Sequence, residues 1–138
     1  MKKLLIFFTV VFALTACGNE ATQNIDDTSE PDSATEISSP FETIDLDDIE
    51  DYVAEGYIVA DVREVDEFES GHIPNALNAP LSELENGELG PLDENEKYVI
   101  ICRSGNRSAV ASNILSQLGF DIVNVSEGMS TWTGDVNQ

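Results

Sequence analysis

The stretch that decides the fold is KYVIICRSGNRSAVASNILSQLG, residues 97–119. Residues 97–102 are strand formers with apolar side chains on both faces, which is typical of a central strand in a parallel sheet. The residues after them have apolar side chains at helical spacing, and Gly119 ends that pattern. The expected apolar side of this helix comprises Val110, Ala111, Ile114, Leu115 and Leu118. The stretch therefore predicts a strand, a short loop and a helix.

Segments of the same two kinds lie on both sides of this unit. Strands are expected at 57–61, 76–80 and 121–125, and short helices at 46–55, 65–70, 81–87 and 127–134. Strands that alternate with helices indicate a parallel sheet covered on both faces. We therefore predict one small α/β domain over residues 41–138, with a central parallel sheet of about five strands.

The amino-terminal segment has the pattern of a targeting signal. Lys2 and Lys3 precede an apolar stretch, 4–14, that is too short to span a bilayer comfortably. It runs into LTAC, residues 14–17, which resembles a bacterial lipobox. We expect residues 1–16 to be a lipoprotein signal peptide and Cys17 to be lipidated. An ordinary signal peptide and an uncleaved signal anchor are the alternatives.

Residues 17–40 are then expected to form an acidic, Ser/Thr-rich tether, extended by its own charge. It would hold the folded domain away from a bacterial membrane on the extracytoplasmic side. The domain itself is expected to be a monomer.

The charge of the chain excludes one broad class of function. The formal net charge is −21, with only six Lys and Arg residues, so no basic surface can form for nucleic acid or anionic lipid. Removal of residues 1–16 would leave four cations. These are Arg63, Lys97, Arg103 and Arg107. Two of the four, Arg103 and Arg107, lie within five residues of Cys102. In a chain with so few cations, this clustering indicates that the loop has a function.

Cys102 could have one of four roles: a buried core residue, a metal ligand, a disulfide partner or a nucleophile. Lipidation of Cys17 would leave it unpaired, because the chain has two cysteines. A zinc site needs three or four ligands, and His72 is the only histidine. We therefore expect no metal and no cofactor.

The loop after Cys102 has the chemistry of an anion cradle. Gly105 permits an unusual backbone angle and Asn106 tolerates one, so the backbone N–H groups can turn towards the sulfur. The following helix adds its free N–H groups and the positive end of its dipole. Together these groups would lower the pKa of the thiol and hold an anion above it. Arg103 and Arg107 would add charge for an oxyanionic substrate.

Three motifs resemble one family. CRSGNRS (102–108) resembles the active-site loop of rhodanese-domain sulfurtransferases, and DVREVDEFESGHIPNALNAPL (61–81) resembles the upstream signature of that family. GMSTW (128–132) resembles its closing segment. The resemblance covers 41–138 and implies a single-domain rhodanese.

The resemblance also implies a mechanism. Cys102 would take sulfane sulfur from thiosulfate or a persulfide donor and pass it from a Cys102 persulfide to cyanide or a thiol. The loop residues that match the family's substrate-binding positions are Arg103, Ser104, Gly105, Asn106, Arg107 and Ser108. The residues that match the upstream signature, taken as structural support, are Asp61, Arg63, Glu67 and His72. Among these, we expect Arg63 to pair with Glu67, and we expect His72 to be a turn residue rather than a general base.

Two other functions remain open. One is a persulfide-carrying or redox-sensing module without turnover. The other is phosphatase or arsenate chemistry. Four residues separate Cys102 from Arg107, whereas cysteine phosphatases have five, a wider cradle that suits phosphate. The spacing therefore favours sulfur.

Overall fold

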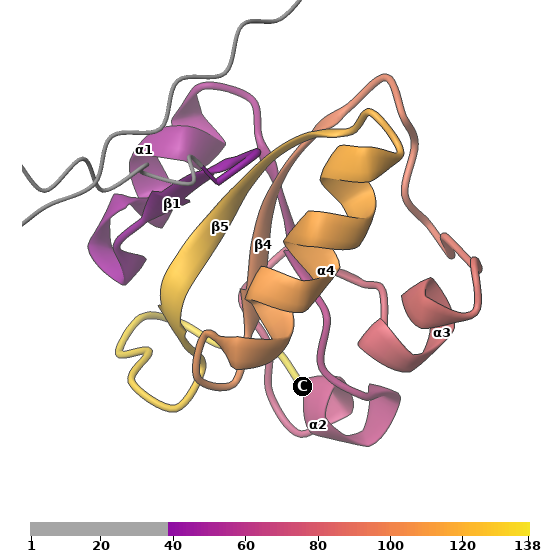
Figure 1. The fold of residues 1–138 in the computed structure, drawn as a ribbon. Coiled ribbons are helices and arrows are strands. Elements are labelled where there is room, and N and C mark those ends of the chain that lie inside the picture. The colour runs from indigo at the N-terminus through magenta and orange to yellow at the C-terminus, as the bar shows by residue number, and fades with distance from the viewer. Residues whose placement is uncertain (1–38) are drawn as a thin grey trace, which may run out of the picture. The chain divides into compact units, whose positions relative to one another are not determined.

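The computed structural model describes residues 39–138, so the predictions for the signal peptide, for Cys17 and for most of the tether lie outside the described residues. The strands are β1 (Glu42–Ile44), β2 (Ile58–Asp61), β3 (Leu77–Asn78), β4 (Lys97–Cys102) and β5 (Asp121–Gly128). They form one sheet in the order β1-β5-β4-β2-β3, and every neighbouring pair is parallel (Figure 1). The predicted α/β class and parallel sheet are therefore confirmed.

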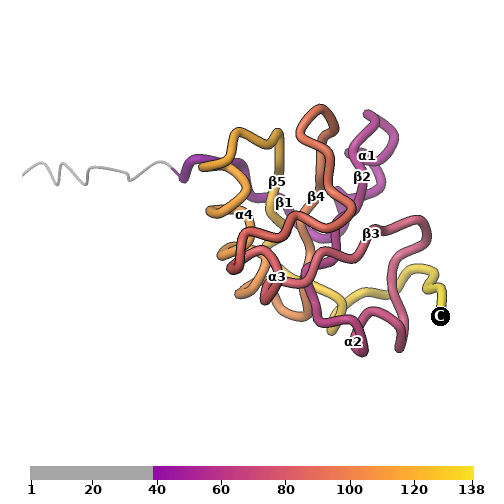
Figure 2. The backbone as a smooth tube through the Cα atoms, turned by 90° about the vertical axis from the view of Figure 1, so that its right-hand side faces the viewer, coloured from indigo at the N-terminus to yellow at the C-terminus, as the bar shows by residue number. Residues whose placement is uncertain are grey.

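Helices cover both faces of this sheet. They are the 3₁₀ helix η1 (Leu46–Asp48) and the α-helices α1 (Ile49–Ala54), α2 (Val65–Glu69), α3 (Leu81–Glu85) and α4 (Asn106–Gln117). Figure 1 shows α1 and α4 on opposite sides of β4 and β5. In both views the C-terminal end lies beside α2 (Figure 2), where the backbones of His72 and Asn137 form an isolated antiparallel bridge.

Strand β4 is the centre of the core. Alternate side chains of a strand point to opposite faces, and here all but Lys97 are buried. Tyr98, Ile100 and Cys102 pack on the α3–α4 side. Val99 and Ile101 pack on the α1 side. A strand apolar on both faces has this position because neither face meets water.

Several predicted elements differ from the observed ones. Strand β1 is only three residues long, too short for a periodic pattern, and was not predicted. The helix expected at 127–134 is wrong, because β5 continues to Gly128 and a turn follows. The strand at 76–80 shortens to Leu77 and Asn78, which are the two residues in register with β2.

The buried side of α4 also differs from the apolar side that was predicted. Val110 and Leu118 are 44% and 54% exposed. The buried residues of α4 are Ser108, Ala111, Ser112 and Leu115. Helix α4 lies against β4 and β5, and small side chains allow the helix to approach the sheet closely. Ser108 and Ser112 therefore occupy buried positions, whereas the apolar Val110 and Leu118 face solvent.

Candidate active site

Cys102 is the last residue of β4, and the structure places it under a tight loop. The side chain is 1% exposed. A register shift between β4 and β5 pairs Cys102 with Gly128. The backbone carbonyls of Cys102 and Arg103 lie so close to Gly128 that a Cβ atom there would collide with them. This close approach holds the end of β4 firmly against β5.

The loop that follows brings its backbone N–H groups to the sulfur. Gly105 has φ +88° and precedes α4 as its N-cap, and its N–H donates to the Cys102 Sγ at 3.2 Å. The N–H groups of Ser104 and Ser108 also hydrogen-bond to this sulfur. A side chain at position 105 would collide with the carbonyl of Ser126. The loop therefore requires glycine there, both for its angle and for its space.

The electrostatics of Cys102 favour the thiolate. Burial raises the pKa of the thiol, because it removes water from the charged form. Hydrogen bonds from the Ser108 hydroxyl and from the N–H groups of Ser104, Ser108 and Gly105 outweigh burial, so the pKa of Cys102 lies below its ordinary value. The N-terminal end of α4, directly after the loop, acts in the same direction. The result is a nucleophile that is shielded from bulk water.

The Ser108 hydroxyl has a choice of acceptors. It is fully buried and can donate to the carbonyl oxygen of Gly105 at 2.9 Å or to that of Val125 at 3.3 Å. It also hydrogen-bonds to Cys102. A hydroxyl has one proton, so it donates to a carbonyl while the sulfur is a neutral thiol and can turn to the sulfur when the thiolate forms.

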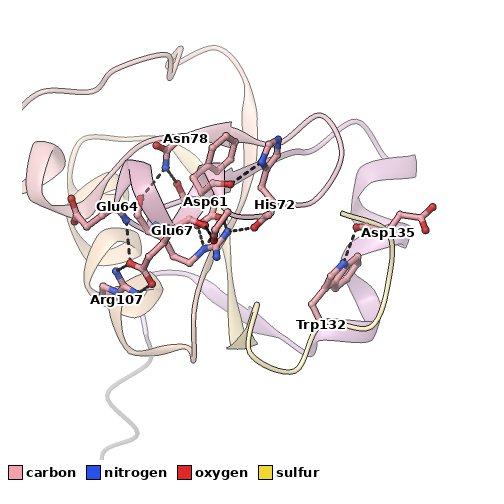
Figure 3. A network of polar contacts seen from close by, with 12 residues as sticks. Asp61, Glu64, Glu67, His72, Asn78, Arg107, Trp132 and Asp135 are labelled. Carbon is pink, nitrogen blue, oxygen red and sulfur yellow. Dashed lines mark hydrogen bonds and ion pairs between the residues drawn. The ribbon is translucent and has the colours of Figure 1, made fainter. Parts of the chain in front are cut away.

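Arg107 is held by a carboxylate from α2. Its Nη1 donates to Glu67 Oε2 at 2.6 Å and its Nη2 to Oε1 at 2.9 Å (Figure 3). The hydrogen bond from Arg107 is the largest influence on Glu67 and lowers the pKa of that carboxyl. Glu67 therefore neutralises the positive charge of Arg107, which sequence reasoning had offered to an oxyanionic substrate.

The expected pairing of Arg63 with Glu67 is wrong, because Arg63 pairs with Asp61 instead. Nε and Nη2 of Arg63 donate to Asp61 Oδ2 at 2.9 and 2.6 Å, and Nη2 also donates to the Gly71 carbonyl at 2.8 Å. Asp61 is fully buried. The Asn78 side chain donates to the carbonyls of Asp61 and Arg63 at 3.0 and 2.9 Å. This network joins β2 to β3 and to Gly71, the residue before His72. It therefore stabilises the backbone around Arg63.

His72 is held by contacts with α2 and with the C-terminal end. Its Nδ1 lies 2.9 Å from the Phe68 carbonyl oxygen, and its ring stacks on the Phe68 ring with centroids 3.8 Å apart. Its backbone N–H and C=O pair with Asn137 at 3.0 and 2.8 Å. His72 therefore lies in this isolated bridge, just before the turn at Pro74 and Asn75 rather than in it (Figure 3).

Arg103 is the exposed cation beside the sulfur. Among the four cations of residues 39–138, it alone forms no ion pair, because Arg63, Lys97 and Arg107 pair with Asp61, Asp121 and Glu67. It lines a hollow of about 280 Å³, which we call the mouth; Cys102, the neighbour of Arg103 in the chain, does not itself line it. The other residues of the mouth are Arg63, Glu67, Ser70, Met129 and Ser130.

Sequence reasoning missed Met129, Ser130 and Ser70 as parts of this mouth. The N–H groups of Met129 and Ser130 donate to the carbonyls of Cys102 and Arg103 at 2.9 and 3.0 Å, so the segment after β5 runs beside the loop. The motif GMSTW includes Met129 and Ser130, but the helix expected at 127–134 gave no reason to place them beside Cys102.

Two further properties bear on the class of site. Within residues 39–138, no group of three or more His, Cys, Asp or Glu side chains could hold a metal ion. In the same range, no helix is both long and apolar enough to cross a membrane.

The fold and the site together define a class of protein. A buried thiolate ends the central strand of a parallel sheet and sits under backbone N–H groups at the start of a helix, which is the arrangement of α/β domains with a cysteine nucleophile. The family described as Rhodanese-like domain matches residues 41–135. The chain belongs to this family.

Known relatives agree with this assignment. The putative sulfurtransferase YtwF of Bacillus subtilis is 40% identical over 75 residues, which cover 54% of this chain and 72% of that protein. The putative sulfur carrier protein YrkF of the same organism is 43% identical over 77 residues. These residues cover 55% of this chain but only 41% of YrkF, so the chain spans less than half the length of that relative.

Solved structures give the same fold. A rhodanese-related protein from Thermoplasma volcanium superposes with a TM-score of 0.63 at 39% identity, covering 70% of this chain and 98% of that one. The human single-domain sulfurtransferase TSTD1 has a TM-score of 0.55 at 27% identity, covering 65% and 93%.

Proposed function

We propose that this protein transfers sulfane sulfur through a persulfide on Cys102. The family and the relatives named as sulfurtransferase and sulfur carrier support sulfur transfer as the general chemistry. The observation that carries the proposal is the geometry of Cys102, which is buried at the end of β4, accepts a hydrogen bond from the Gly105 N–H at 3.2 Å and lies at the N-terminal end of α4; the lowered pKa of its thiol agrees with it. The same donors suit the terminal sulfur of a persulfide anion.

In the first half of the reaction, the Cys102 thiolate attacks the outer sulfur of thiosulfate. The sulfur–sulfur bond of the donor breaks, and sulfite leaves with its electron pair. With an organic persulfide as donor, a thiolate leaves instead. In the second half, cyanide or a thiol attacks the terminal sulfur of the Cys102 persulfide and the Cys102 thiolate returns. Each half exchanges one bond to sulfur for another, so no external oxidant or reductant is needed.

The two arginines of the loop have different roles in this proposal. Arg103 binds the anionic part of the donor at the mouth, because its charge is free. Arg107 is a positioning residue that ties the start of α4 to α2 through Glu67. Ser104, Gly105 and Ser108 hold the sulfur. Asn106 begins α4.

Asp61, Arg63 and His72 support the site from below. Arg63 also lines the mouth, but both its Nε and its Nη2 already donate to Asp61. We therefore propose that these three residues maintain the turns that carry Glu67.

A sulfur carrier without turnover is the second candidate, favoured by the name of YrkF. Steady-state thiocyanate formation from thiosulfate and cyanide separates the two. Many turnovers per protein, lost in Cys102→Ser, support the enzyme. A single stoichiometric transfer supports the carrier, and no transfer with thiosulfate or with an organic persulfide contradicts both.

We also propose that Cys17 is lipidated and that the domain is held at the extracytoplasmic side of a bacterial membrane. The lipobox-like sequence LTAC supports this. Labelled palmitate should appear on the wild-type protein and be absent from Cys17→Ser. A soluble secreted product without lipid would contradict it.

A further inference from the structure

A second hollow lies on the α1 side of the sheet, apart from the residues that line the mouth. It has a volume of about 260 Å³, and its apolar wall is formed by residues of α1, of the turn after His72 and of the C-terminal segment. We call it the Trp132 groove. Its apolar lining includes Ile49, Val53, Ile73, Pro74 and Trp132.

The groove exposes apolar surface that the fold has not covered. Val53 is 46% exposed, and it is one of the five exposed large hydrophobic residues of the described chain. Trp132 is half-buried. Its indole N–H donates to the Asp135 carbonyl at 3.0 Å, and Figure 3 shows the two residues together on the C-terminal segment. An apolar hollow with a partly exposed aromatic ring is a common feature of interaction sites.

The rim of the groove is acidic and electrically unpaired. Glu50 and Asp135 line it, and Asp47 joins Glu50 around an adjoining hollow on Trp132. All three are exposed. The ion pairs among residues 39–138 involve none of them. A ligand that fills the groove therefore meets apolar surface in the middle and negative charge at the edge.

This charge excludes several occupants. Residues 18–38 carry six carboxylates and no Lys or Arg, so the chain's own amino-terminal segment is repelled. A second copy carries the same net charge of −21 and is repelled as well. An anionic lipid surface is excluded for the same reason.

The groove is also close to the mouth. Ser130 lines the mouth and Trp132 lines the groove. Two residues of extended chain span at most about 7 Å, so the backbones of these two residues are that close. A partner seated in the groove would therefore lie beside the mouth.

We propose that the Trp132 groove is a docking surface for a protein segment that presents one apolar side chain flanked by Lys or Arg. The apolar side chain fills the hollow over Val53 and Trp132. The basic residues meet Glu50 and Asp135.

Trp132 is the only tryptophan of the chain, so its fluorescence reports directly on the groove. The probe is the peptide acetyl-Lys-Leu-Lys-Arg-amide, titrated into the full chain without any sulfur donor. We expect a saturable change in fluorescence. Replacing the leucine of the peptide by serine should weaken binding by at least about tenfold, because serine cannot bury the apolar surface that leucine places in the groove.

Two charge variants of the protein test the location. Glu50→Gln should weaken binding by about threefold, the usual size of an exposed charge contact. Glu85→Gln removes the same charge from α3, on the opposite face of the sheet, and should leave binding unchanged. Val53→Ser, at an exposed position that does not threaten the fold, should weaken only the leucine peptide.

Three results would overturn the proposal. The first is equal weakening by Glu50→Gln and Glu85→Gln, or equal binding of both peptides, which would indicate general attraction to an acidic protein. The second is the absence of any saturable change in Trp132 fluorescence when the leucine peptide is added. The third is a fluorescence change with protein concentration alone, which would indicate a second copy. These binding measurements do not use persulfide chemistry. A negative result would therefore reject the docking surface without bearing on the proposed sulfur transfer.

Discussion

The Ser108 hydroxyl offers the sharpest test of how the loop controls its sulfur. Of the four donors that lower the pKa of Cys102, it is the only side chain. Substitution of Ser108 by alanine removes this donor and leaves the backbone N–H groups in place. We expect Ser108→Ala to raise the pKa of Cys102, because the thiolate loses a hydrogen bond and burial, which also raises the pKa, remains.

The size of the effect follows from the choice of acceptors. A hydrogen bond to a charged group contributes about 1.5–3 kcal/mol, and a neutral one about 0.5–1.5 kcal/mol. The hydroxyl gives up a neutral bond to Gly105 or Val125 when it turns to the thiolate. The difference is about 1–1.5 kcal/mol, and one pKa unit corresponds to about 1.4 kcal/mol. We therefore expect the thiolate fraction of Cys102 at a pH below its pKa to fall by roughly tenfold.

The assay is the rate of Cys102 alkylation by iodoacetamide as a function of pH, read by intact mass. Ser112→Ala is the matched control, since Ser112 is another fully buried serine of α4 whose hydroxyl has no hydrogen-bond partner. It should leave the alkylation profile unchanged. An unchanged profile in Ser108→Ala, or an equal shift in both variants, would refute the reasoning.

Three further substitutions test other parts of the site. Arg103→Gln should raise the KM for thiosulfate several-fold, whereas Lys97→Gln, which removes an equal but distant charge, should not; steady-state kinetics that show equal effects would count against a local role. Glu67→Gln should lower stability by less than about 1 kcal/mol at neutral pH. Because the folded pKa of this carboxyl is lowered, the contribution is present above its ordinary pKa of about 4.3 and is lost as pH falls through the folded value. Urea unfolding should therefore show a larger deficit of the variant at pH 7 than at pH 3, and an equal deficit at both would contradict the ion pair. Gly105→Ala should lower stability by more than about 2 kcal/mol, and Gly119→Ala, which has a similar φ but open space, by about 1 kcal/mol; equal thermal shifts would show that the collision with β5 does not matter.

The strand, loop and helix around Cys102 could be predicted from the sequence because each is a local feature. A strand of mostly apolar residues, a loop with Gly105 and a helical pattern that ends at Gly119 follow one another within 23 residues. The observed β4 has the predicted bounds, and α4 begins at Asn106, one residue before the predicted helix.

The partners of the charged residues could not be predicted in the same way. Glu67 and Arg107 are 40 residues apart, and only the docking of α2 against the loop brings them together. Sequence spacing suggested a pair between Arg63 and Glu67 because both lie in one motif. The buried Asp61 is adjacent to Arg63 in space and takes that arginine instead.

The path of the chain after β5 was also beyond sequence reasoning. GMSTW contains Gly, Ser and Thr, which are weak helix formers, and its backbone N–H groups bond to the carbonyls of Cys102 and Arg103. The turn after Gly128 places Met129 and Ser130 at the mouth and Trp132 in the groove. These contacts come from strands far apart in the sequence, so no local pattern predicts them.

The most direct test of the central claim is the intact mass of the protein after exposure to thiosulfate and removal of the excess. We expect a gain of one sulfur atom in the wild-type protein. That sulfur should map to Cys102, be absent from Cys102→Ser and be lost on addition of cyanide. An unchanged mass, with thiosulfate and also with an organic persulfide as donor, would contradict sulfur transfer through a Cys102 persulfide.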